Sequence, residues 1–430
     1  MNKKILLISP LEDFLINPKF FPPLGILYLS SYLKQHYYEV DVIHGDIKDI
    51  KKDYDFYGIS SSTPQYPKAK KILEHIKINN PKAKVILGGA HVNSEKCALE
   101  ALIDGFDYVV RGTGEKSLLK IVEGEENRKL IVGERLTQEE LDNLLPDRDA
   151  INIEEYGYPI GDKKAITIIT SRGCPYRCSF CSISCGRVDF RDYKKVIEEI
   201  FLLKKRYGYE NFMFLDDSFT VNKKRLKNIL EGLKDQSIRY RCYARADNSS
   251  EESLLKLMLK TGCVELGVGI ESGSQKILDL VDKKTSVKDN LKFLELARKI
   301  GIRINSFIMI GLPGEDIESV NDTREFMEKT KPEAFGYNIF TPMPDSPIVV
   351  NYEKKIEYGP YKGKSFKDFI TIYPMPYEKA VTKAKKIEEC FVSTPALSRE
   401  DILRIYNEEF ERFIEITGFD PRKRDKKIIS

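Results

Sequence analysis

Three cysteines lie within eight residues of one another, with the spacing Cys-x3-Cys-x2-Cys. They are Cys174, Cys178 and Cys181, and they follow a short apolar run at 166–170. Thiolates are soft ligands that select iron–sulfur clusters, zinc or Cu(I). A structural zinc site needs four ligands, normally two pairs a dozen or more residues apart, and no second Cys-x2-Cys is present. The spacing therefore predicts an iron–sulfur cluster with one iron left open for a substrate.

A further cysteine, Cys185, extends this run to Cys-x3-Cys-x2-Cys-x3-Cys. It has two possible roles: a fourth ligand that closes the cluster, or a spare thiol close to the substrate. The other four cysteines are scattered, and eight in 430 residues are too few for a disulfide framework. All four histidines precede residue 92, so a Ser–His or Cys–His catalytic pair is excluded from the rest of the chain.

Strand and helix signals alternate over residues 1–122, which predicts a doubly wound parallel sheet. Strands are expected at 5–9, 39–43, 56–60, 85–87 and 108–110, and helices at 25–35, 67–78 and 94–103. Such sheets bind ligands at the carboxyl ends of their strands. Here these ends carry small residues, which let a large ligand approach the backbone: Ser61, Ser62, Gly88, Gly89, Gly112 and Gly114.

A second series of strand–helix units begins after a charged, irregular linker at 123–163. Its six strands are expected at 165–171, 212–215, 239–243, 264–270, 303–310 and 334–339. Six such units in 164–345 predict a partial (β/α)6 barrel with its site at the carboxyl ends of the strands. Residues 346–430 are expected to form a mostly helical cap, helical from 377 to 416.

Side chains able to bind a ligand follow four successive barrel strands: Asp216 and Asp217, Arg245, Glu271 and Ser272, and Ile310 and Gly311. Arg245 suits a carboxylate because its guanidinium is a fixed fork of donors. Two structural alternatives stay open. The two aspartates could cap the next helix, and Glu271 could form an internal ion pair with Arg245.

The loop Cys174-Pro175-Tyr176-Arg177-Cys178-Ser179-Phe180-Cys181 resembles the signature of the radical S-adenosylmethionine (SAM) superfamily, with Phe180 in the aromatic place. The resemblance implies that Cys174, Cys178 and Cys181 hold a [4Fe–4S] cluster whose open iron chelates SAM. An external one-electron reductant of ferredoxin or flavodoxin type then drives cleavage to methionine and a 5′-deoxyadenosyl radical. The residues implied to bind SAM are Phe180, Asp216, Asp217, Arg245, Glu271, Ser272, Ile310 and Gly311.

Residues 1–122 are similar to the cobalamin-binding domain of one large subgroup of this superfamily. The similarity lies in Pro-Pro-Leu-Gly-Ile-Leu-Tyr-Leu at 22–29, Gly-Gly-Ala-His at 88–91 and Arg-Gly-Thr-Gly-Glu-Lys-Ser at 111–117. The residues implied to bind cobalamin are Ser61, Ser62, Gly88, Gly89, His91, Gly112, Gly114 and Glu115. The Asp-x-His-x-x-Gly pattern of histidine-ligated cobalt is absent, which implies a cobalamin with no histidine below it. His91 then either contacts the corrin or is an ordinary loop histidine.

Two other kinds of N-terminal domain are excluded. The corresponding half of methylthiotransferases holds a second cluster on three cysteines, whereas residues 1–163 contain only Cys97. A dinucleotide-binding domain needs Gly-x-Gly-x-x-Gly after its first strand, where this chain has Ser9-Pro10-Leu11-Glu12.

The resemblance implies a cobalamin-dependent radical SAM methyltransferase acting on an unactivated carbon. The substrate class stays open among a peptide or protein side chain, a lipid, and a tetrapyrrole or antibiotic precursor. The alternatives are a cobalamin-containing radical enzyme that forms or contracts rings without methyl transfer, and a non-catalytic metal and corrinoid carrier. The 70 basic and 66 acidic residues are interspersed, so no nucleic-acid partner is expected. No apolar run approaches the ~20 residues of a membrane span, and a cytoplasmic protein is expected.

Overall fold

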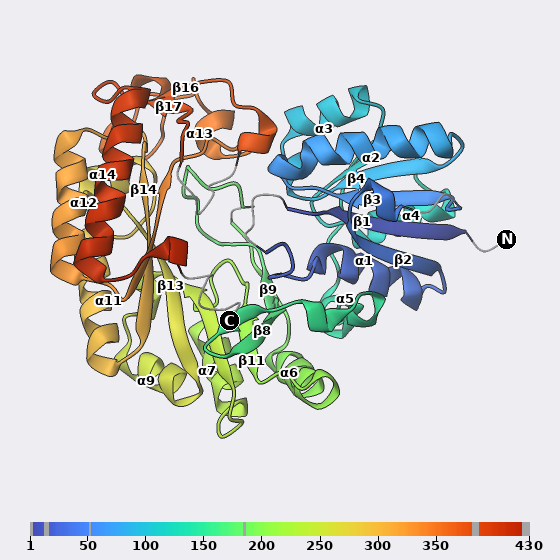
Figure 1. Ribbon diagram of the computed structural model, residues 1–430, viewed down its shortest axis with the longest axis horizontal. Coiled ribbons are helices and arrows are strands. Elements are labelled where there is room, and N and C mark those ends of the chain that lie inside the picture. The colour runs from blue at the N-terminus through green and yellow to red at the C-terminus, as the bar shows by residue number, and fades with distance from the viewer. Residues whose placement is uncertain (1–2, 13–16, 51–52, 184–185, 381–386, 424–430) are drawn as a thin grey trace. The chain divides into compact units, whose positions relative to one another are not determined.

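The computed structural model describes residues 3–12, 17–50, 53–183, 186–380 and 387–423 (Figure 1). The chain forms two compact units. The first contains Met1–Gly157 and Met375–Val381, and the second contains Tyr158–Pro374 and Thr382–Ser430. No helix in the described part of the chain is long and apolar enough to cross a membrane.

The first unit is a parallel six-stranded sheet with the order β2-β1-β3-β4-β5-β6. Its strands are β1 (Lys4–Pro10), β2 (Glu39–Gly45), β3 (Phe56–Ser60), β4 (Lys84–Gly88), β5 (Tyr108–Arg111) and β6 (Leu130–Val132). Its helices are α1 (Leu24–Gln35), α2 (Tyr66–Asn79), α3 (Glu95–Ile103), α4 (Glu115–Glu123) and α5 (Gln138–Asn143). The doubly wound parallel sheet predicted from the sequence is confirmed.

The strands of this sheet are apolar on both faces because helices cover both faces of a parallel sheet. In β1, the run Ile5–Ile8 is fully buried. On one face, Leu6 and Ile8 pack in a core cluster with Ile72 and Ile76 of α2. The segment predicted as a linker contributes β6, which pairs in parallel with β5. Three residues are too few to show a strand periodicity, so the sequence did not reveal this strand.

The second unit is a seven-stranded sheet with the order β15-β14-β13-β12-β11-β8-β7. Its strands are β7 (Tyr158–Ile160), β8 (Lys163–Ile168), β11 (Asn211–Phe214), β12 (Arg239–Ala244), β13 (Cys263–Glu271), β14 (Arg303–Ile310) and β15 (Ala334–Ile339). Its helices are α6 (Tyr193–Tyr207), α7 (Lys223–Gly232), α8 (Ala246–Ser249), α9 (Glu252–Lys260), α10 (Gln275–Leu280), α11 (Val287–Ile300), α12 (Ile317–Thr330), α13 (Pro347–Val350) and α14 (Arg399–Thr417).

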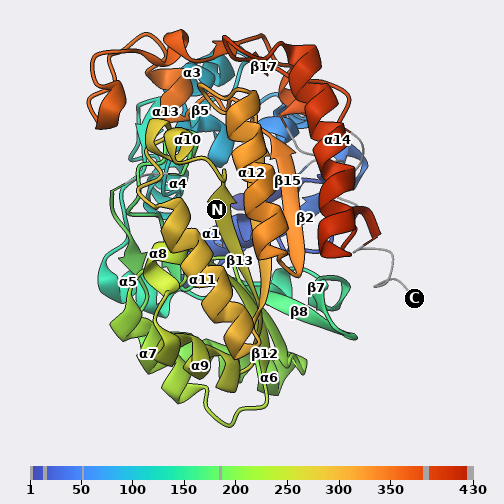
Figure 2. The same cartoon turned by 90° about the vertical axis from the view of Figure 1, so that its left-hand side faces the viewer.

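Six of these strands are parallel and follow one another in chain order, as the predicted partial (β/α)6 barrel requires. β7 adds an antiparallel edge strand that the sequence analysis missed. Helices α11, α12 and α14 lie along the outer face of the sheet (Figure 2).

The C-terminal helical extension is α14, which packs against β15. The rings of Tyr337 and Tyr406 stack with centroids 5.1 Å apart, and the Phe335 and Phe413 rings meet edge to face at 5.8 Å. The helix predicted to run from 377 to 416 is wrong in its first part. There the described residues form a short 3-10 turn and a strand, β17 (Val392–Ser393), which pairs with β16 (Thr371–Ile372).

Candidate functional site

The three predicted cluster ligands lie on one loop after β8. The loop begins with β9 (Ser171–Arg172), which pairs antiparallel with β10 (Asp189–Phe190). Cys178 is buried, Cys174 and Cys181 are half-buried, and none of the three is in a disulfide. The loop therefore presents three thiols at the carboxyl end of the first parallel barrel strand.

The start of this loop is held by buried polar groups from neighbouring elements. Asp216, which follows β11, accepts hydrogen bonds from Thr170 N at 2.7 Å and from the Thr170 and Ser171 hydroxyls at 2.5 Å. Arg225 of α7 donates to Thr170 O at 2.8 Å. Asp216 is only 1% exposed, and burial raises the pKa of its carboxyl. Its oxygens are bonded to the loop, so its place is that of a positioning residue, whereas the adjacent Asp217 is exposed.

The middle of the loop is bonded on both sides through the backbone of Ser179. Its N–H donates to Val281 O, just after α10, at 2.9 Å. Its carbonyl accepts from Ile348 N of α13, also at 2.9 Å. Backbone bonds at Ser179 thus hold the stretch between Cys178 and Cys181 in place, independently of any bound group.

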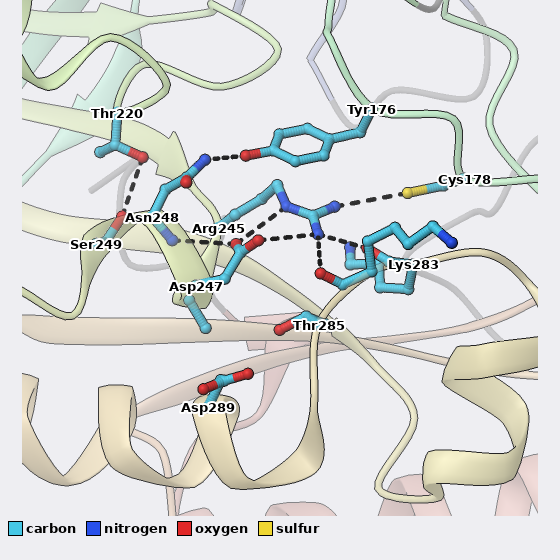
Figure 3. Close-up of polar contacts among 12 residues, drawn as sticks. Tyr176, Cys178, Thr220, Arg245, Asp247, Asn248, Ser249, Lys283, Thr285 and Asp289 are labelled. Carbon is cyan, nitrogen blue, oxygen red and sulfur yellow. Dashed lines mark hydrogen bonds and ion pairs between the residues drawn. The ribbon is translucent and has the colours of Figure 1, made fainter.

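Arg245 follows β12 and lies beside the cysteine loop (Figure 3). It forms an ion pair with Asp247 at 3.1 Å. Glu271 instead pairs with Lys283, with Nζ and Oε1 2.6 Å apart. The alternative ion pair between Glu271 and Arg245 is therefore wrong: each has another partner.

Glu271 ends β13 with φ +66, a left-handed conformation that costs energy for a residue other than glycine. Both Glu271 and Lys283 are buried. A Cβ at Gly269 would lie 2.2 Å from Glu271 Oε1 and 2.9 Å from Lys283 Nζ, so a larger residue there would have to displace the ends of the paired side chains. Lys283 Nζ also lies 5.7 Å from the centroid of the half-buried Phe180 ring. Lys283, which the sequence analysis did not single out, thus links Glu271 to the cysteine loop.

The remaining strand-end residues of the second unit are bonded within the chain. The hydroxyl of buried Ser272 lies 3.2 Å from Thr323 Oγ1. Ile310, at the end of β14, is buried. Gly311 has φ +85, and its N–H donates to the carboxylate of Glu315. Glu315 is buried, and this burial raises its pKa to about 8.

In the first unit, Gly89 has φ +96, and a Cβ there would lie 2.6 Å from Ser61 N. Ser61 Oγ donates to Ser62 O at 2.8 Å, and Ser62 Oγ donates to Gln65 Oε1 at 2.8 Å. A Cβ at Gly88 would meet only Val110 O, at 3.8 Å. The glycine at 89 is therefore required by the neighbouring backbone, whereas Gly88 is much less crowded.

Gly112 differs from Gly89 in its surroundings. It has φ +79, but a Cβ there would find nothing within 4 Å. Its N–H donates to Asn93 Oδ1 at 3.1 Å. Gly114 precedes α4 and packs near Leu29, and Glu115 is the buried first residue of that helix. Of the glycines at these strand ends, Gly112 leaves the most space for a ligand.

His91 lies inside the first unit. Its ring stacks on Tyr66 with centroids 4.0 Å apart and meets the Tyr377 ring edge to face at 4.9 Å. Its Nδ1 is 3.4 Å from Thr63 Oγ1, while its buried Nε2 has no hydrogen-bond partner among the described residues. Burial lowers the pKa of His91 to about 4, so the imidazole is neutral at pH 7.

Two family models match this chain. The model of the B12 binding domain matches residues 18–122, and that of the radical SAM superfamily matches residues 168–327. The fold and the cysteine loop thus define a radical SAM enzyme with a cobalamin-binding domain. The chain thus combines a radical SAM domain with a B12 binding domain, as cobalamin-dependent radical SAM enzymes do. Its cofactors are a [4Fe–4S] cluster, SAM and cobalamin.

Curated relatives include proteins with two different activities in their names. An uncharacterized methyltransferase of Pyrococcus horikoshii is 28% identical over 86% of this chain and 87% of its own length. An anaerobic magnesium-protoporphyrin IX monomethyl ester cyclase of Rubrivivax gelatinosus is 27% identical over 80% of this chain and 69% of its own.

The fold matches that of TsrM, a radical SAM methyltransferase from Kitasatospora setae. Its structure with cobalamin and a [4Fe–4S] cluster has a TM-score of 0.68 and 17% identity, covering 99% of this chain and 90% of TsrM. Its structure with tryptophan substrate and a SAM analogue has a TM-score of 0.68 and 18% identity, covering 98% and 90%.

The cysteine loop supplies three thiolates, the number that a [4Fe–4S] cluster with one open iron requires. In the described residues, no three His, Cys, Asp or Glu side chains are grouped so that they could hold one metal ion. A [4Fe–4S] cluster binds each thiolate through a different iron, so its ligands are spread around a larger group. Cys185 lies outside the described residues, and its two proposed roles stay open.

Proposed function

We propose that this chain is a cobalamin-dependent radical SAM methyltransferase that methylates an unactivated carbon. The observation that carries the proposal is the three-cysteine loop, anchored after the first barrel strand of a chain that also contains a B12 binding domain. When bound, the cofactors supply one-electron cleavage of SAM and transfer of a methyl group. The chain's own residues hold and orient these groups.

Within the second unit, we assign Cys174, Cys178 and Cys181 to the cluster. Asp217 is exposed beside the cysteine loop, and its carboxylate suits the ammonium of the methionyl group. We also assign Glu271, which is paired with Lys283 at the end of β13, to SAM binding.

In the first unit, we assign the corrin and its tail to the strand ends around Gly88, Gly112 and Gly114. The open space at Gly112 supports this assignment, because a large planar ligand needs a close approach to backbone N–H groups. Ser61, Ser62 and Gly89 shape the neighbouring backbone. His91 is neutral and packed between aromatic rings, which argues for a structural role beside the ligand.

We propose a small molecule or a peptide or protein side chain as the substrate. The tryptophan bound to TsrM supports an amino-acid-containing substrate. The electron is proposed to come from a reductant of ferredoxin or flavodoxin type.

Incubation of the reduced holoenzyme with methyl-labelled SAM tests the proposal. Label is expected first on the corrinoid and then on the product, together with 5′-deoxyadenosine. Label that never reaches the corrinoid, despite formation of 5′-deoxyadenosine, would overturn the methyl-transfer step. Absence of 5′-deoxyadenosine under all reducing conditions would favour the non-catalytic carrier.

The second candidate is oxidative ring formation without methyl transfer. The similarity to the Rubrivivax gelatinosus cyclase over 80% of the chain supports it. A product whose mass reflects loss of hydrogen, with no gain of a methyl group, would establish this alternative in place of the first.

A further inference from the structure

The geometry points to Arg245 as the residue that sets the reduction potential of the cluster, through a hydrogen bond to the sulfur of Cys178. This inference rests on the cluster site proposed above. The sequence analysis had instead expected the Arg245 guanidinium to bind SAM.

The guanidinium N–H groups of Arg245 donate to other groups of the protein. Nη1 donates to Cys178 Sγ at 3.6 Å, and Nε donates to Asp247 Oδ1 at 3.1 Å. Nη2 donates to Asp247 Oδ2 at 3.3 Å, to the carbonyl of Lys283 and, at 3.4 Å, to that of Lys284. The side chain is 8% exposed. A ligand carboxylate would have to displace one of these partners to bind the guanidinium.

The guanidinium is also held by an aromatic ring against one of its faces. Arg245 Cζ lies 3.6 Å from the centroid of the Tyr176 ring, within range of a cation–π contact. Tyr176 belongs to the cysteine loop, and its hydroxyl is hydrogen-bonded to Asn248 of α8 (Figure 3). The same short helix is tied down by Ser249, whose hydroxyl bonds to Thr220 Oγ1 at 3.0 Å. The position of the donor relative to Cys178 is therefore fixed by several independent contacts.

A fixed cation beside a ligand sulfur changes the reduction potential of the cluster. Hydrogen bonds to the sulfurs and the local net charge are among the factors that set iron–sulfur potentials. One-electron reduction adds a negative charge to the cluster, and a neighbouring cation attracts that charge more strongly in the protein interior than it would in water. Arg245 therefore makes the cluster easier to reduce. Asp247 carries the opposite charge against the same guanidinium and partly offsets its effect.

This arrangement predicts shifts of opposite sign for the two members of the ion pair. Arg245→Gln is expected to lower the ratio of reduced to oxidised cluster about tenfold at a given potential, which corresponds to about 59 mV for one electron. Asp247→Asn is expected to raise that ratio. A general loosening of the loop gives no such reversal of sign.

The measurement is a redox titration of the reconstituted cluster, followed by electron paramagnetic resonance without SAM, beside a binding titration with SAM. The matched control is Arg303→Gln, which removes an arginine from β14 that pairs with Glu265 at 2.9 Å, away from the cysteine loop. The control is expected to keep the wild-type potential.

The outcomes separate the inference from its alternatives. An unchanged potential in Arg245→Gln with weakened SAM binding would make Arg245 a SAM ligand and overturn the inference. If Arg245→Gln assembles no cluster, as iron and sulfide analysis would show, Asp247→Asn decides, because it keeps the arginine. A raised potential there supports the inference, and an unchanged one overturns it. A wild-type protein that assembles no cluster overturns the proposed cluster site itself.

Discussion

The two parallel sheets end their strands in different ways. At the strand ends of the first unit, small residues and a neutral buried imidazole predominate, with Gly112 facing open space. At the strand ends of the second unit, charges occur in pairs: Lys283–Glu271 is buried, and Arg245 pairs with the half-buried Asp247. The same α/β architecture therefore provides room in one unit and fixed electrostatics in the other.

The surroundings of one glycine in each unit differ in the same way. Gly89 is required because the backbone of Ser61 is close, whereas at Gly269 the ends of the paired Glu271 and Lys283 side chains occupy the space of a Cβ. A glycine at a strand end therefore does not by itself indicate a ligand. The neighbouring atoms decide which of these roles it has.

The largest effect is expected from removing a cluster ligand in the second unit. Cys178→Ala should abolish the cluster and bring formation of 5′-deoxyadenosine to background, because three thiolates are needed to hold it. Iron, sulfide and 5′-deoxyadenosine are measured, with corrinoid binding followed by absorbance. Corrinoid binding should survive because the first unit provides it, and Cys390→Ala, outside the loop, should retain both. A full cluster in Cys178→Ala would contradict the ligand assignment.

The next effect concerns two adjacent lysines. Lys283→Met leaves Glu271 buried without its partner and should lower the free energy of unfolding by about 3 kcal/mol. Lys284, whose side chain is 63% exposed, pairs with Asp282, and Lys284→Met should cost less than about 1 kcal/mol. Denaturant midpoints of the full chain measure both. Equal losses would show that the buried pair has no special role.

Two glycines of the first unit provide a smaller contrast. Gly89→Ala forces a Cβ against Ser61 and should destabilise the protein by about 2 kcal/mol. Gly112→Ala meets no neighbouring atom and should cost about 1 kcal/mol, the price of its positive φ alone. Thermal unfolding measures stability, and corrinoid titration measures binding. If Gly112 faces the ligand, Gly112→Ala should weaken corrinoid binding by more than its loss of stability explains. Normal corrinoid binding in this variant would show that Gly112 is not part of the binding site.

The last prediction is a pH dependence of opposite sign in the two units. The pKa of His91 falls from 6.5 to about 4, so between these values the unfolded chain binds the additional proton and stability decreases as pH falls. The pKa of Glu315 rises from 4.5 to about 8, so over that window the folded chain binds the additional proton and stability decreases as pH rises. Each slope is at most about 1.4 kcal/mol per pH unit.

Substitutions separate these two contributions. Relative to the wild type, His91→Gln should gain stability at pH 5, and Glu315→Gln should gain it at pH 8. Unfolding midpoints at the two pH values measure both differences. Parallel pH profiles for wild type and both variants would contradict the protonation states assigned to these groups.

Most of the regular elements follow from local pattern. The strands expected at 56–60, 303–310 and 334–339 have the observed bounds of β3, β14 and β15. Their apolar runs are long enough to distinguish a buried strand from a loop. The short strands β6 and β7 are defined by hydrogen bonds to their neighbours, which no local pattern records.

By itself, the sequence determined an iron–sulfur loop and two α/β units, because the cysteines are close together in the chain and the strand periodicity is local. The resemblance of its motifs to known families implied the radical SAM and cobalamin-binding domains. The tertiary structure alone decided the partners of the charged groups. Arg245 meets Cys178, 67 residues earlier, and Glu271 meets Lys283, which lies beyond helix α10. These pairings depend on distances between strand ends and on desolvation, and both exist only once the sheet has formed.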